Sequence, residues 1–170
     1  MRLFIAIPLS REMKKTVRDV QDQIRRQKVS GNFTIHENLH ITLAFIGEYD
    51  SPERVLELLE RISFHPFTIK MDRIGSFGGL WWTGFEDCRQ LEAIVKRLRH
   101  ALSDAGIPFD NKRFKAHVTI LRKPNYYNND FPHIEIKPVS MTVDHIALMK
   151  SDRGKNGMIY TELGTVSADI

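Results

Sequence analysis

Two short stretches of the sequence share a pattern of residues that could do chemistry. HITL spans residues 40–43 and HVTI spans residues 117–120, so each has a histidine followed two positions later by a threonine. The other residues of both stretches are aliphatic, which is typical of a β-strand. In a strand, residues i and i+2 point to the same face. We therefore expect His40 with Thr42, and His117 with Thr119, to present an imidazole and a hydroxyl side by side.

Paired imidazoles and hydroxyls suit proton transfer at a phosphate group. Near pH 7 a histidine can take either protonation state, so one imidazole can accept a proton while a second donates one. Threonine hydroxyls can donate hydrogen bonds to non-bridging phosphate oxygens. If the two strands face each other across a cleft, these four side chains favour in-line displacement at phosphorus without a metal.

Basic residues surround the second pattern. The run NKRFKAHVTILRK contains five lysines and arginines and no acidic residue. Such a cluster suits a phosphate charge, although a solvated basic surface would look the same. Arg122 follows His117 by five residues, near the expected end of the strand, and we expect it to bind phosphate. Lys115 is a further candidate for contact with the substrate.

One run resembles a metal site by spelling. HENLH, at residues 36–40, matches the zinc pattern His-Glu-x-x-His, which binds metal only when it lies on a helix. Gly31 and Asn32 closely precede the run and a strand-like stretch overlaps its end, so a helix is not expected there. The sequence also has no phosphate-binding Gly-x-x-x-x-Gly-Lys run. We predict no metal and no cofactor.

Length and composition fit one folded domain. The chain has 170 residues, and we expect residues 1–170 to form a single two-lobed domain. The net charge of +4 mildly favours an anionic partner such as RNA. One cysteine permits no internal disulfide, and no apolar run approaches the roughly 18 residues of a membrane helix. These features predict a cytoplasmic protein that does not contact membranes. We also expect a monomer.

The expected elements repeat along the chain. In each half a helix leads to a His-x-Thr strand and then to a pair of strands. We predict an α+β fold of two pseudo-symmetric lobes, each with an antiparallel sheet and outer helices, around a central cleft. The predicted helices cover residues 10–27, 51–62 and 88–105. The predicted strands cover residues 3–9, 39–46, 67–74, 80–85, 116–121, 134–137, 141–150 and 158–165.

Four runs together resemble a known family. They are RLFIAIPL, NLHITLAFIGE, IGSFGGLWWTGF and FKAHVTILRK, and they occur in the family's order over nearly the whole chain. The sequence resembles the two-histidine phosphoesterase superfamily, and within it the LigT-like RNA 2′,3′-cyclic phosphodiesterases, formerly called 2′-5′ RNA ligases. The resemblance implies metal-independent opening of an RNA terminal 2′,3′-cyclic phosphate to a 2′-phosphate.

The same resemblance assigns roles to residues. It implies that His40 and His117 are catalytic, with His40 as the acid and His117 as the base. It implies that Thr42 and Thr119 bind the phosphate. Phe33 stands where the family often has a tryptophan, and there it could stack on a base.

Other functions fit the same residues. A 2′-5′ RNA ligase or 2′-5′ phosphodiesterase would use the same site, and a noncatalytic RNA-binding module would keep the cleft. The expected substrate is RNA with a terminal cyclic phosphate, tRNA fragments included, or a small cyclic nucleotide.

Overall fold

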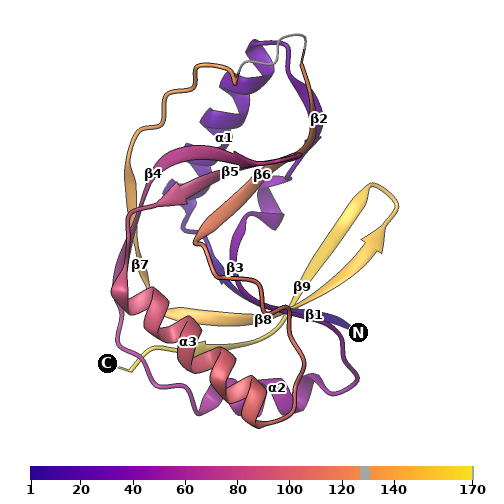
Figure 1. The fold of residues 1–170 in the computed structure, drawn as a ribbon, viewed down its shortest axis with the longest axis vertical. Coiled ribbons are helices and arrows are strands. Elements are labelled where there is room, and N and C mark those ends of the chain that lie inside the picture. Colours follow the sequence, from indigo (N-terminus) through magenta and orange to yellow (C-terminus); the bar gives the residue numbers. More distant parts are fainter. Residues whose placement is uncertain (127–130, 170) are drawn as a thin grey trace.

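The computed structural model describes residues 1–126 and 131–169. Within them the chain forms two antiparallel sheets and three α-helices, so the predicted α+β architecture of two lobes is confirmed (Figure 1). One sheet has four strands in the order β3-β1-β8-β9. The other has five strands in the order β2-β6-β5-β4-β7.

The four-stranded sheet carries the first motif. It is built from β1 (Arg2–Pro8), β3 (His40–Glu48), β8 (His145–Gly154) and β9 (Gly157–Ser167). Apolar residues of β1 and β3 on one face of the sheet are buried, which fixes the register because a slip by one residue would expose them. They include Leu3, Ile5, Ile41 and Leu43, each fully buried.

The five-stranded sheet carries the second motif. It contains β2 (Ser30–Phe33), β4 (Phe67–Phe77), β5 (Leu80–Phe85), β6 (His117–Asn125) and β7 (Val139–Val143). Strands β3 and β6 lie next to each other where the two sheets meet. The two His-x-Thr strands therefore come together although they belong to different sheets.

The helices cover the ends of this arrangement. Helix α1 (Arg11–Arg26) begins at Ser10, whose hydroxyl oxygen accepts a hydrogen bond from the Met13 amide at 3.2 Å. It packs against β6 and β7, while α2 (Pro52–Glu60) and α3 (Arg89–Asp104) pack against each other. Figure 1 shows α1 at one end of the molecule and the other two helices at the opposite end.

We had expected each half of the sequence to form one sheet, but each sheet contains strands from both halves. The pair β4–β5 follows the His40 strand in the chain but joins the sheet of His117, where β5 pairs with β6. The later pair β8–β9 joins the sheet of His40, where β8 pairs with β1. Each half thus gives a strand pair to the other lobe, and one continuous apolar core connects them.

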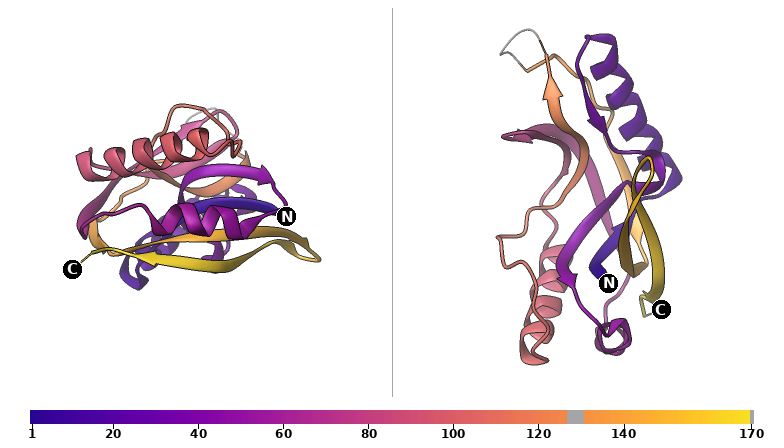
Figure 2. Two further views of the ribbon diagram at one scale, coloured as in Figure 1. Left: turned by 90° about the horizontal axis from the view of Figure 1, so that it is seen from below. Right: turned by 90° about the vertical axis from the view of Figure 1, so that its right-hand side faces the viewer.

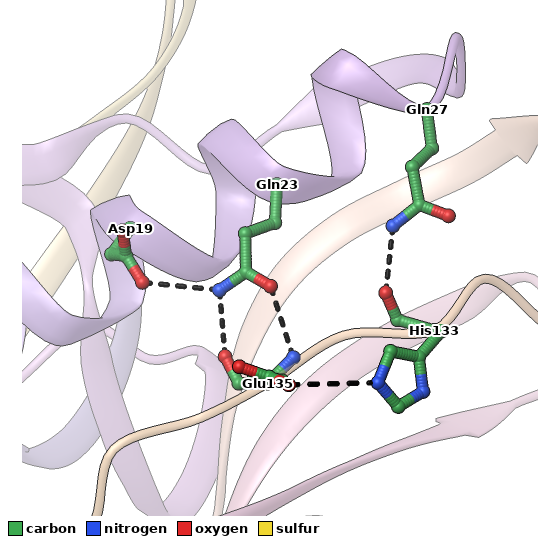
Figure 3. Close-up of polar contacts among 5 residues, drawn as sticks. All are labelled: Asp19, Gln23, Gln27, His133 and Glu135. Atoms are coloured by element: carbon green, nitrogen blue, oxygen red, sulfur yellow. Dashed lines mark hydrogen bonds and ion pairs between the residues drawn. The ribbon is translucent and has the colours of Figure 1, made fainter.

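The predicted strand at residues 134–137 is wrong. This segment makes no sheet ladder because the side chains of α1 satisfy its backbone (Figure 3). Gln23 Nε2 donates to the Glu135 carbonyl at 2.6 Å, and the Glu135 amide donates to Gln23 Oε1 at 2.9 Å. Gln27 Nε2 donates to the His133 carbonyl at 2.7 Å. A glutamine side chain here replaces a neighbouring strand.

Candidate active site

Both motif histidines begin their strands and face one cleft. His40 is the first residue of β3, and His117 is the first residue of β6. Alternation along each strand buries the intervening aliphatic residues and leaves the histidines and threonines half-buried. A cleft of about 360 Å³ is lined by His40, Thr42, His117, Thr119 and Arg122, among others. The structure therefore brings together these five predicted site residues.

The His40 imidazole is held from both nitrogens. Its Nδ1 lies 2.6 Å from the Asn38 carbonyl oxygen, and its Nε2 lies 2.8 Å from the Thr42 hydroxyl. A carbonyl can only accept, so Nδ1 carries the hydrogen and the Thr42 hydroxyl donates to Nε2 in the neutral ring. The rings of Phe4 and Tyr160 lie 4.9 and 5.3 Å from the imidazole, centroid to centroid. These contacts leave the imidazole one orientation.

The His117 imidazole is held in a related but different way. Its Nδ1 lies 2.6 Å from the Lys115 carbonyl oxygen, which again places the hydrogen on Nδ1 and leaves Nε2 as the acceptor. The Phe77 ring approaches it edge to face at 5.6 Å. The Lys115 ammonium lies 5.0 Å from the Phe77 ring centroid and 4.5 Å from that of Trp82.

The pKa values of both histidines are lowered. Burial is the largest cause at each, because it disfavours the charged imidazolium. The positive charge of Arg122 lowers both pKa values further, and Lys115 adds to the effect at His117. At His117 burial lowers the pKa more than the nearby positive charges do. Since the pKa of His40 shifts in the same direction, the shifts do not separate an acid from a base.

A β-bulge brings Arg122 into the cleft. Strict alternation from His117 would point Arg122 to the opposite face, because it lies an odd number of residues away. The pairing of β5 with β6 skips Ile120, since Trp81 pairs with Leu121 and Trp82 with Thr119. Bulges re-aim side chains in this way. His117, Thr119 and Arg122 consequently share one face.

The first motif strand has the same irregularity. Ala6 pairs with Thr42 and Phe4 with Phe45, so His40, Thr42 and Phe45 share the cleft face. Phe45 follows His40 by five residues, as Arg122 follows His117. The Arg2 guanidinium lies 5.1 Å from the Phe45 ring centroid and also lines the cleft. Arg2 thus supplies a positive charge on the His40 side, where the strand itself has an aromatic residue.

Two further predicted contacts lie beside the cleft rather than in it. Lys115 lines a neighbouring groove of about 560 Å³, together with Phe77 and Trp82. Phe33 is half-buried in β2, and the Arg25 guanidinium stacks over it, 4.1 Å from the ring centroid. Phe33 is not among the described residues that line the cleft. Whether either residue contacts the substrate stays a prediction.

The HENLH run has no helix that could form a zinc site. His36–Asn38 form one short 3₁₀ turn, after which β3 begins at His40. Over residues 1–126 and 131–169, no group of three or more histidine, cysteine or carboxylate side chains is placed to hold a metal ion.

The cleft contains residues that the sequence did not single out. They are Arg2, Phe4, Thr34, Asn38, Phe45, Ser151, Arg153, Met158 and Tyr160. Most come from strands far from the motifs in sequence, so only the pairing register places them. The run of β1 gives no local signal either, because Phe4 is apolar and buried like Leu3 and Ile5. No aspartate or glutamate is among the described lining residues.

Two imidazoles, two threonine hydroxyls and three arginines around one cleft are the features of a two-histidine phosphoesterase. The chain belongs to the 2′-5′ RNA ligase superfamily, whose match spans residues 11–155. The family resemblance inferred from the sequence is thereby confirmed.

Named relatives match over most of the chain. An RNA 2′,3′-cyclic phosphodiesterase of Thermotoga maritima is 28% identical, covering 96% of this chain and 93% of the relative. One from Methanocaldococcus jannaschii is 31% identical, covering 94% and 96%. The crystal structure of Escherichia coli LigT complexed with 3′-AMP superposes with a TM-score of 0.85 at 25% identity, covering 98% of this chain and 97% of that one.

Proposed function

We propose that this protein is an RNA 2′,3′-cyclic phosphodiesterase that leaves a 2′-phosphate and needs no metal. Several curated relatives that match most of this chain are named RNA 2′,3′-cyclic phosphodiesterase. The observation that carries the mechanism is the pair of half-buried imidazoles that face one arginine-lined cleft.

The two histidines divide the proton transfers. His117 takes a proton from water, whose oxygen attacks phosphorus opposite the 3′-oxygen. The bond from phosphorus to the 3′-oxygen breaks, and His40 donates the proton that the leaving oxygen requires. The product keeps the phosphate on the 2′-oxygen. The anionic phosphate raises the pKa of a nearby histidine, so with substrate bound one imidazole can be protonated while the other is neutral.

Hydroxyl and guanidinium groups bind the phosphate oxygens. In the free protein the Thr42 hydroxyl donates to His40 Nε2, so protonation of that nitrogen turns the hydroxyl toward the substrate. Thr119 occupies the corresponding place two residues after His117. Arg122 lowers the pKa of both histidines, which places its charge near both and suits binding of the phosphate between them.

The test uses an RNA that ends in a 2′,3′-cyclic phosphate, incubated with the protein in EDTA. We expect full turnover, and we expect the product to co-migrate with a 2′-phosphate standard rather than a 3′-phosphate one. Loss of turnover in EDTA that zinc or manganese restores would refute the metal-free mechanism. A 3′-phosphate product would reverse the assignment of the leaving oxygen.

A second reaction is favoured by the groove beside His117. The groove has aromatic and basic walls from Phe77, Trp82 and Lys115, and it is large enough for a nucleoside. A nucleoside 5′-hydroxyl placed there could replace the attacking water, which gives a 2′-5′ linkage. Adding an RNA with a free 5′-hydroxyl and measuring the joined product tests this. Absence of a joined product at high RNA concentration would leave hydrolysis as the single reaction.

Further properties belong to the same proposal. Residues 1–170 act as one two-lobed monomer in the cytoplasm, without a membrane partner, and the substrate is a terminal cyclic phosphate on RNA, tRNA fragments included, or a small cyclic nucleotide. The continuous core supports the single unit. No helix in the described part of the chain is long and apolar enough to span a bilayer.

A further inference from the structure

The β8–β9 hairpin extends the cleft beyond His40. Beyond the pairing of Arg2 with Ser151, no strand within residues 1–126 and 131–169 pairs with the hairpin, and its far end projects past β1 and β3 (Figures 1 and 2). Ser151 pairs with Tyr160 and Arg153 pairs with Met158, so these four residues share one face. All four line the cleft. The projecting part of the hairpin is therefore a wall of the site.

The hairpin is attached at the candidate catalytic histidine. Asn38 Nδ2 donates to the Met158 carbonyl at 2.9 Å, and the Asn38 carbonyl is the partner of His40 Nδ1. The Tyr160 ring contacts the His40 imidazole and lies 4.9 Å from the Phe4 ring, centroid to centroid. In the proposed mechanism His40 protonates the leaving 3′-oxygen, so the terminal nucleoside lies on this side of the phosphate.

The two faces of the hairpin differ in charge. On the outer face Lys150 pairs with Asp152 at 3.2 Å, which neutralises both. On the cleft face, Arg153 and the neighbouring Arg2 have no carboxylate within ion-pair distance in the described part of the chain. Two unpaired guanidinium groups in a cleft without carboxylates attract an anion.

The spacing along β1 matches one nucleotide. Phe4, next to His40, and Arg2 are two residues apart on the same face, which is about 7 Å in a strand. This is comparable to the spacing of successive phosphates along an RNA strand. A nucleoside placed against the half-buried Tyr160, whose ring packs on the buried Phe4, would thus carry its 5′-phosphate to Arg2 and Arg153.

We propose that Arg2 and Arg153 form a second phosphate subsite, for the phosphate on the 5′ side of the terminal nucleoside. The inference rests on the proposed function and sharpens it. The substrate is an oligoribonucleotide of at least two nucleotides, because a nucleoside 2′,3′-cyclic phosphate has no phosphate to place there. Such a subsite distinguishes an RNA end from a free cyclic nucleotide.

The test compares two substrates in four proteins. The substrates are adenosine 2′,3′-cyclic phosphate and the dinucleotide ApA that ends in a 2′,3′-cyclic phosphate. The proteins are the parent, Arg2→Gln, Arg153→Gln and the matched control Lys155→Gln, which removes a charge from the turn of the same hairpin outside the described cleft lining. The quantity measured is kcat/KM for the dinucleotide divided by kcat/KM for the mononucleotide. Thermal unfolding verifies that each variant is folded.

We expect the parent to prefer the dinucleotide and each arginine variant to lose about tenfold of that preference, because each loses a charge-assisted hydrogen bond. Lys155→Gln should keep the parent's ratio. Equal rates on both substrates in the parent, or an equal loss in Lys155→Gln, would overturn the subsite. For binding, the dissociation constant of adenosine 2′-phosphate is measured and divided by that of ApA 2′-phosphate. If the parent turns over neither substrate, the proposed function fails, while the binding ratio still decides the subsite.

Discussion

The two halves of the cleft hold their histidines alike but surround them differently. Each imidazole begins a strand, sits 2.6 Å from a backbone carbonyl two residues before it, and precedes a bulge that aims the fifth residue after it into the cleft. That fifth residue is Phe45 in one half and Arg122 in the other. The backbone thus fixes the orientation and the tautomer of both imidazole rings in the same way, whereas the side chains around the two rings differ.

The difference in surroundings matches the two roles. His40 has two aromatic neighbours, the buried Phe4 and the half-buried Tyr160, and its Nε2 bonds the Thr42 hydroxyl. His117 has one aromatic neighbour, Phe77, and its pKa is lowered by burial first and then by the charges of Lys115 and Arg122, of which Arg122 acts on His40 too. The proposed mechanism requires the acid to lie beside the nucleoside and the base to lie beside the basic residues. The pKa of His40 is lowered, mainly by burial, so the proposed division requires the bound phosphate to raise it.

The largest expected effect comes from removing either imidazole. His40→Ala and His117→Ala should each lower kcat/KM on RNA by roughly 10²–10⁴-fold, the usual contribution of a general acid or base. An aryl phosphodiester with an activated leaving group separates the two, because its leaving oxygen needs no proton. His40→Ala should then regain most of its activity, while His117→Ala should not.

His100→Ala is the control, since this exposed histidine on α3 lies outside the cleft. The reverse pattern on the aryl substrate would exchange the two roles. Equal loss in both variants would remove the division of labour altogether.

A smaller effect should come from the two hydroxyls. Thr42→Ala and Thr119→Ala each remove a hydrogen bond to a charged phosphate, worth roughly 1.5–3 kcal/mol, so kcat/KM should fall about 10- to 100-fold. Thr42→Ala should also change the pH dependence, because Thr42 alone of the two bonds its histidine in the described structure. Thr161→Ala on the opposite face of β9 is the control. Parent-like kcat/KM in both cleft variants would show that the hydroxyls do not hold the phosphate.

Arg122 should have the smallest effect on rate and the clearest effect on pH dependence. The free-enzyme pKa values appear in kcat/KM: activity is lost as pH falls through the pKa of the base and as pH rises through that of the acid. Since both histidine pKa values are lowered, the maximum should lie on the acid side of the ordinary histidine pKa. Arg122→Gln removes a positive charge near both rings, so both pKa values rise and the whole profile moves to higher pH.

The same variant should raise KM and reduce the dependence of binding on salt, because one phosphate contact fewer releases fewer counterions. Lys96→Gln, at an exposed position on α3, is the matched control. A profile that stays in place, with an unchanged salt slope, would put Arg122 outside the field of both histidines.

What the sequence predicted correctly depends on local patterns. The alternation in the two motif strands and the helical periodicity of α1 and α3 are written in neighbouring residues, so these elements were found. Strand β2 was missed because Ser30, Gly31 and Asn32 look like a turn. Gly31 is needed there because β6 passes so close that a side chain would meet the Lys123 carbonyl oxygen at 2.8 Å. Nothing near position 31 in the sequence reports that contact.

The rest of the site depends on long-range pairing. Tyr160 and Arg153 enter the cleft because β9 pairs with β8 and β8 pairs with β1, and no local pattern encodes that register. The family resemblance could point to the motif residues, since these are short and contiguous. The segment at residues 134–137 was instead predicted as a strand that the structure lacks. Its residues alternate as in a strand, but Gln23 hydrogen-bonds the backbone of Glu135.

The exchange of strand pairs also determines when the protein becomes complete during synthesis. Arg2 pairs with Ser151, so the sheet of His40 stays open along β1 until β8 has emerged. Closing contacts over such sequence separations is slow. We therefore expect ribosome-bound chains that stop before residue 139 to carry both motifs yet fail to bind adenosine 2′-phosphate, which stalled chains can test. A growing chain thus acquires its complete cleft only after β8 and β9 have left the ribosome.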